Sequence, residues 1–102
     1  MFDEHAYYAA VSGLTPPEAY SLADHQMAFW LSELGAGAPQ GYSSVKLAFM
    51  SSATGLDPSL GIGRIEHDYW ALASGLTPID AYSLSDHKSV VMGSATPPPT
   101  AG

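Results

Sequence analysis

Apolar positions along this chain recur at the spacing of α-helices, and glycine or proline interrupts them at short intervals. The period-two alternation of a half-buried strand does not occur. The pattern therefore predicts an all-α protein with helices over about 3–12, 16–20, 22–34 and 43–53. The clearest apolar stripe lies in the third of these helices, where one face carries Leu22, Ala23, Met27, Trp30, Leu31 and Leu34.

One stretch of the sequence occurs twice. Residues 4–26 and 66–88 align at an offset of 62, and 15 of the 23 aligned positions are identical. Self-similarity of this kind indicates one supersecondary unit used twice. We therefore expect two similar helix–corner–helix repeats joined by a partly helical linker rich in glycine and serine. The predicted divisions are a first repeat over 1–35, a linker over 36–63, a second repeat over 64–93 and a mobile proline-rich tail over 94–102.

The segment between the two repeats permits two interpretations. Gly55-Leu56-Asp57-Pro58 resembles the corner of the full repeats and follows an apolar run at about 43–53, so it is either a third, degenerate copy or a chance recurrence of an effective helix stop. In the second full copy, the last helix is shorter by one or two turns than its counterpart in the first.

Each corner of the repeat carries signals for one helix to stop and another to start. Gly13 can adopt positive φ and close the first helix, and Thr15, Pro16 and Glu18 have the spacing of a capping box with proline at the first helical position. Ser21 to Asp24 is a second such box, which would restart the helix in a new direction. The predicted structural residues of the two corners are Gly13, Thr15, Pro16, Gly75, Thr77 and Pro78.

Size and charge exclude several classes of function. One unit of about 30 residues is too small to fold alone without disulfides or metal, and there is no cysteine, so the two copies pack together or on a partner. The net charge is −7, which disfavours nucleic acid and anionic membrane surfaces and favours a basic protein partner. The sequence contains no 18-residue apolar run and no basic segment at its start, so we expect neither a membrane span nor a signal peptide.

Four histidines, each preceded by an acid, are the most conspicuous reactive groups. We expect no metal or other cofactor; the alternative is a metal site in which the two histidines of a unit, 20 residues apart, join nearby carboxylates (His5, His25, His67 and His87). In the other interpretation the acids cap helix N-termini and His25 ties the corner to a neighbouring carbonyl group. No nucleophile elbow, phosphate loop or dinucleotide motif is present, and Ser12 is better explained by the helix end than by a pair with His5, so the chain is predicted to be no enzyme and to have no small-molecule substrate.

Aromatic residues recur at matched positions of the two copies. Such residues dominate both protein cores and the hot spots of interfaces, and we expect a unit this small to offer some of them to a partner. The predicted partner-binding residues are Tyr8, Tyr20, Trp30, Trp70 and Tyr82.

The stretch Gly13-Leu14-Thr15-Pro16-Pro17-Glu18-Ala19-Tyr20-Ser21-Leu22-Ala23-Asp24 resembles a pattern in small bacteriophage tail-assembly chaperones and related phage morphogenesis proteins. The match covers about 12 residues in each copy, and the chain departs from the family in its single aromatic residue at Tyr20 and in its duplication. The resemblance implies a non-enzymatic protein that binds phage capsid or tail proteins, in the virion or in the host cytoplasm. The expected function is thus a small phage structural or assembly protein whose two repeats bind equivalent surfaces of a repeating partner, and the other candidate is a generic acidic adaptor.

Overall fold

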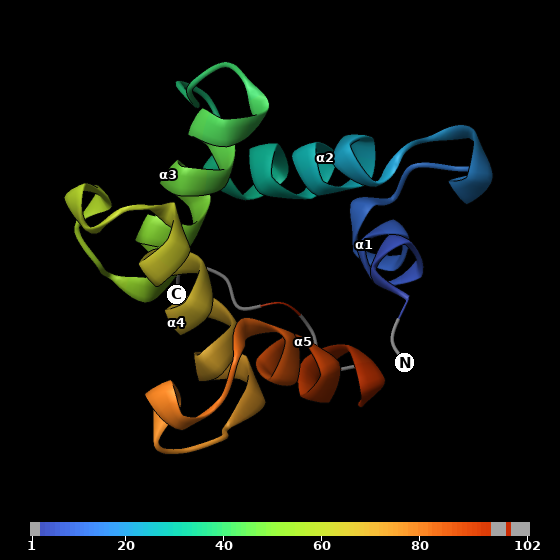
Figure 1. Ribbon diagram of the computed structural model, residues 1–102. Coiled ribbons are helices and arrows are strands. Elements are labelled where there is room, and N and C mark those ends of the chain that lie inside the picture. Colours follow the sequence, from blue (N-terminus) through green and yellow to red (C-terminus); the bar gives the residue numbers. More distant parts are fainter. Residues whose placement is uncertain (1–2, 95–97, 99–102) are drawn as a thin grey trace.

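The computed structural model describes residues 3–94 and 98, and over these residues the protein is all-helical, without a strand (Figure 1). The all-α prediction is therefore confirmed. The α-helices are α1 (Glu4–Ser12), α2 (Leu22–Leu34), α3 (Tyr42–Thr54), α4 (Ile62–Ser74) and α5 (Leu84–Gly93). Three short 3₁₀ helices lie between them: η1 (Pro17–Ala19), η2 (Pro58–Leu60) and η3 (Ile79–Ala81).

Glycine in the left-handed conformation ends three of the helices. Gly13, Gly55 and Gly75 follow α1, α3 and α4 with φ of 77°, 75° and 72°. A Cβ atom at any of them would meet no other heavy atom within 4 Å, so the requirement for glycine comes from the backbone conformation and not from crowding. The predicted roles of Gly13 and Gly75 are confirmed.

Of the two capping boxes predicted at each corner, the structure contains the second. The hydroxyl of Ser21 accepts from the backbone N–H of Asp24 at 3.1 Å, and the Asp24 carboxylate accepts from the N–H of Ser21 at 3.1 Å; the same pair of bonds starts α5. The box predicted for Thr15 and Glu18 is wrong. The residue at the N-cap of η1 is Pro16, whose side chain has no oxygen, and Thr15 lies one residue too early to cap the turn.

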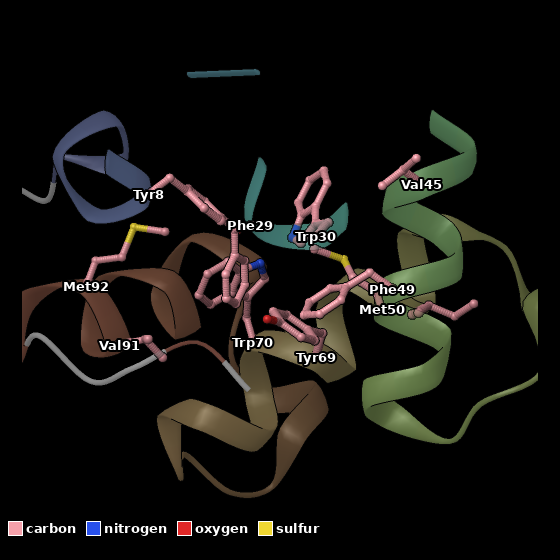
Figure 2. Close-up of a cluster of buried hydrophobic side chains, with 11 residues drawn as sticks. Tyr8, Phe29, Trp30, Val45, Phe49, Met50, Tyr69, Trp70, Val91 and Met92 are labelled. Atoms are coloured by element: carbon pink, nitrogen blue, oxygen red, sulfur yellow. The ribbon is translucent and has the colours of Figure 1, made fainter. Parts of the chain in front are cut away.

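The helices pack mainly against their neighbours in the chain, and the chain curls so that α5 comes back near α1 (Figure 1). The ring of Tyr8 in α1 lies 6.0 Å from the ring of Trp30 in α2 and 6.4 Å from that of Trp70 in α4, centroid to centroid. Figure 2 shows these side chains converging with those of Phe29, Phe49 and Tyr69. The two sequence repeats therefore share one hydrophobic core.

The middle segment contributes to this core as well. Residues 36–63, expected to be a partly helical linker, contain the 13-residue helix α3, which packs against both α2 and α4. Its buried apolar residues are Val45, Phe49 and Met50. The end of α3 also resembles the ends of α1 and α4, because the hydroxyl of Thr54 accepts from the N–H of Leu56 at 3.3 Å, just past the helix.

The two copies differ at their ends. Helix α4 begins at Ile62, four residues before Glu66, whereas α1 begins at Glu4, the residue that matches Glu66. Glu66 therefore lies inside a helix, and the expectation that it caps a helix N-terminus is wrong. Helix α5 has 10 residues and α2 has 13, in line with the predicted shortening. Ser94 is the C-cap of α5 and Pro98 is buried, and the rest of the predicted mobile tail lies outside the described residues.

Candidate functional site

The two corners, Ser12–His25 and Ser74–His87, are built around the same serine–histidine pair. The hydroxyl oxygen of Ser12 lies 2.6 Å from Nδ1 of His25, and that of Ser74 lies 2.6 Å from Nδ1 of His87. Each hydroxyl oxygen also accepts a backbone N–H at 3.2 Å, from Leu14 in corner 1 and from the matching leucine in corner 2. The serine at the end of the first helix thus links the turn that follows it to the helix that returns.

The other ring nitrogen of each histidine donates to a backbone carbonyl. In corner 1, Nε2 of His25 donates to the carbonyl of Pro17 at 3.0 Å, and Nε2 of His5 donates to that of Tyr20 at 2.9 Å. A carbonyl oxygen can only accept, so Nε2 carries a hydrogen, and Nδ1 of His25 faces the hydroxyl of Ser12. His67 and His87 make the matching bonds in corner 2, at 2.8 and 3.1 Å. The interpretation in which His25 ties the corner to a neighbouring carbonyl is confirmed.

The structure brings the histidines of each unit together, as the metal alternative requires. The rings of His5 and His25 lie 5.0 Å apart, centroid to centroid, and nearly perpendicular, and His67 and His87 have the same arrangement. The chemistry of the pairs does not suit a metal ion, because Nδ1 of His25 and of His87 is occupied by a serine hydroxyl and both rings are fully buried. Within 3–94 and 98, no group of three or more histidines, aspartates or glutamates could hold a metal ion.

The serine–histidine pairs do not have the geometry of a catalytic site. Ser12 pairs with His25 and not with His5, and its hydroxyl oxygen already contacts the backbone N–H of Leu14 and the carbonyl of Ala9. His25 is 0% exposed, so a substrate cannot reach the imidazole that would have to move the proton. The pairs therefore serve as structural connections.

The structure separates the five predicted partner-binding residues into two groups. Tyr8, Trp30 and Trp70 are at most 1% exposed and form the centre of the core, so their assignment to a partner surface is replaced by a packing role. Tyr20 and Tyr82 are half-buried at the corners, where each ring lies about 6 Å from the buried histidine of its own corner. Only these two of the five reach the surface.

A chain of ion pairs connects α3, α4, α5 and α1. Lys46 in α3 lies 3.0 Å from Glu66 in α4, and Lys88 in α5 lies 3.7 Å from Glu66 and 3.6 Å from Glu4 in α1. Lys88 also stands over the ring of Trp70, 5.8 Å from its centroid. The four charged side chains are between 15% and 25% exposed, so these lysines contribute little positive charge to the surface.

The third fixed cation is also paired. Nη1 of Arg64 lies 2.9 Å from the carboxylate of Asp80 in η3, and its Nε lies 3.3 Å from that of Asp68 in α4. These ion pairs were not predicted from the sequence, although Arg64 and Asp68 are four residues apart, which is the ordinary spacing of an ion pair on a helix. Six exposed carboxylates have no cation partner among the described residues: Asp3, Glu18, Asp24, Glu33, Asp57 and Asp86. The accessible surface of the molecule is therefore strongly acidic.

Comparison with known protein families, curated proteins and solved structures finds no match. The functional inference therefore depends on the corners and on the distribution of charge. None of the helices described here combines the length and the apolar character needed to cross a membrane.

The larger of two surface hollows described here lies beside corner 1. It is an open groove of about 480 Å³ between α1 and η1, lined by Asp3, His5, Ala6, Ala9, Ala10, Pro17 and Glu18. A smaller apolar hollow of about 290 Å³ lies where α3 and α4 begin, lined by Tyr42, Ser43, Lys46, Leu47 and Ile62.

Proposed function

We propose that this chain is a non-catalytic protein that binds a basic protein partner through the acidic surface of its two corners. The observation that carries the proposal is the distribution of charge. Lys46, Arg64 and Lys88 are all used in internal ion pairs, and six exposed carboxylates remain without a cation partner among the described residues. Complementary charge of this kind steers association and selects against acidic partners.

The two corners offer this chemistry twice. Tyr20 and Tyr82 have the same backbone conformation, with φ of −123° and ψ of 144°, and each stands two residues after an exposed acid, Glu18 or Asp80. The corners lie on opposite sides of the molecule, corner 1 at the right of Figure 1 and corner 2 at the lower left. A partner that presents the same basic surface repeatedly would be bound at both corners, which raises the overall affinity without new kinds of contact.

The resemblance of the corner sequence to small phage assembly proteins favours a phage capsid or tail protein as this partner. Such proteins form arrays of identical subunits, which is the arrangement that two equivalent corners would exploit. On this proposal the protein acts in the virion or in the host cytoplasm.

The first step of the test is affinity capture with the tagged intact chain from a lysate of cells that produce it, followed by calorimetric titration of the captured protein in purified form. We expect a basic partner whose affinity falls at least about tenfold when sodium chloride is raised from roughly 50 to 300 mM, because exposed charge pairs are screened. Glu18→Gln should weaken binding by about threefold or more, Asp80→Asn should weaken it less because the Asp80 carboxylate is already paired with Arg64, and the double variant should weaken it further.

Glu33→Gln is the matched control, because it removes an exposed carboxylate of α2 that lies outside both corners. It should leave the affinity within about twofold of the parent value. Binding that is insensitive to salt, or that is equal in the parent and the double corner variant, would overturn the proposal.

A further inference from the structure

The two corners differ at one place where their sequences diverge. In corner 2 the guanidinium of Arg64 lies between the carboxylates of Asp68 and Asp80, at 3.3 and 2.9 Å. At the offset of 62, Asp68 corresponds to Ala6 and Asp80 to Glu18. Corner 2 thus shows, within the same molecule, a guanidinium bound between the helix and the 3₁₀ turn of this unit.

Corner 1 has a groove at the corresponding place. Ala6 and Glu18 both line the open groove of about 480 Å³, and so does Ala10, which corresponds to the larger Leu72 of corner 2. The residue that corresponds to Arg64 is Phe2, which lies outside the described residues, and α1 begins at Glu4, whereas α4 begins a full turn earlier in the alignment. Within the described part of the chain, corner 1 therefore has Glu18, the counterpart of Asp80, and an open groove, but it has no arginine in that groove.

We propose that the groove of corner 1 binds an arginine side chain of the partner protein, in the position that Arg64 occupies in corner 2. This inference rests on the proposed function and names the side chain that the partner contributes. Ala6, Ala9 and Pro17 form an apolar wall for the methylene stem, and the carboxylates of Glu18 and Asp3 stand beside the groove to accept from the guanidinium. Both carboxylates are exposed and have no ion pair within the part of the chain that is described.

Arginine fits the groove better than lysine does. The planar guanidinium can pair with two carboxylates at once, as that of Arg64 does with Asp68 and Asp80, whereas an ammonium group is a single, more strongly hydrated point charge. Because corner 2 already contains its own arginine, the two corners are expected to differ, with corner 1 as the stronger site for the partner.

The test uses a small probe and needs no identified partner. N-acetyl-arginine N-methylamide, which lacks the charged groups of free arginine, is titrated into the ¹⁵N-labelled full chain, with the uncharged citrulline analogue as the matched control. We expect saturable shifts of backbone amides at residues 3–10 and 18, with a dissociation constant on the order of millimolar, and no such shifts with the citrulline probe. Glu18→Gln should raise the dissociation constant by about threefold or more.

Two further variants use the comparison between the corners. Ala10→Leu places in the groove the residue that corner 2 carries at Leu72, an exposed position that accepts leucine without loss of the helix, and it should weaken binding. Arg64→Ala should create a second, weaker site, because Leu72 remains beside it, and this site should be seen as new shifts at Asp68, Ala71 and Asp80, the counterparts of Ala6, Ala9 and Glu18.

Several results would overturn the inference. One is that the arginine and citrulline probes cause equal shifts. Another is that the arginine probe causes no shifts in the groove of the parent chain. A third is that the arginine probe binds only to the Phe2→Ala variant, which would mean that the chain closes the groove itself. Failure here is distinguishable from failure of the proposed function. A basic partner that is captured in a salt-sensitive manner, but unaffected by Ala10→Leu, would leave the acidic corner as the binding surface and exclude only the arginine groove.

Discussion

Replacing Ser12 by alanine should destabilise the protein far more than an ordinary substitution at a helix end. The hydroxyl of Ser12 lies 2.6 Å from Nδ1 of His25 and accepts from the N–H of Leu14 at 3.2 Å. Alanine leaves both groups without a partner, one in a ring that is 0% exposed and one in a half-buried turn.

The size of the effect follows from these two losses. A buried polar group without a hydrogen bond costs about 1–3 kcal/mol, so Ser12→Ala should lower the free energy of unfolding by about 2–4 kcal/mol. A small domain has only about 5–15 kcal/mol in total. Ser74→Ala should have the same effect within about 1 kcal/mol, because the hydroxyl of Ser74 makes the same contacts at 2.6 and 3.2 Å.

The assay is urea unfolding at neutral pH, followed by the fluorescence of Trp30 and Trp70, which are both 0% exposed, and by circular dichroism. Ser12→Thr is the matched control, because Thr54 forms the same bond to the turn at the end of α3, from Oγ1 to the N–H of Leu56 at 3.3 Å. Threonine should retain stability to within about 1 kcal/mol of the parent. A free energy of unfolding for Ser12→Ala within about 0.5 kcal/mol of the parent would refute the role given to the serine–histidine pair.

Three further predictions concern the helix ends and the core. Gly13→Val should lower the free energy of unfolding by about 1–2 kcal/mol or more in thermal or urea unfolding, because valine resists φ of 77°. Gly13→Asn should lower it less, and equal losses for the two variants would contradict the role given to the backbone conformation. Burial raises the pKa of the Tyr8 and Tyr69 phenols above their ordinary value of 10.0. Above about pH 10 the unfolded chain therefore releases protons that the folded chain retains. The free energy of unfolding should then fall by up to about 1.4 kcal/mol per pH unit for each tyrosine. Tyr8→Phe should make that fall less steep in melts recorded from pH 9 to 11, and an unchanged slope would contradict the assignment. A fragment of residues 1–37 should show little helix by circular dichroism, because Tyr8 and Trp30 lose their contacts with Trp70 and Phe49, and a cooperative melt of this fragment would contradict the shared core.

Local structure was the part of the fold that the sequence predicted best. The signals for α2, for Gly13 and Gly75 and for the Ser21–Asp24 capping box are all short-range, since they depend on residues within four positions of one another. The box predicted for Thr15 and Glu18 failed because the corner contains a three-residue 3₁₀ turn, which moves the N-cap to Pro16.

The candidate site was harder to predict because it depends on contacts between distant residues. Tyr8 and Trp70 are 62 positions apart, and nothing in either local sequence shows that each becomes the other's neighbour in the core. Such long-range contacts determine whether an aromatic residue lies in the core or at the surface. The pairing of His25 with Ser12 also depended on the direction in which α2 returns past the end of α1.

Mapping the partner's footprint on the intact chain tests the central claim most directly. Hydrogen exchange of backbone amides, measured with and without the captured partner, should show protection over residues 14–24, with weaker protection over 76–86, and no change in the first turns of α3 and α4. Protection confined to those first turns, around the exposed side chains of Tyr42 and Ile62, would show that the partner uses the apolar hollow there and would contradict the account.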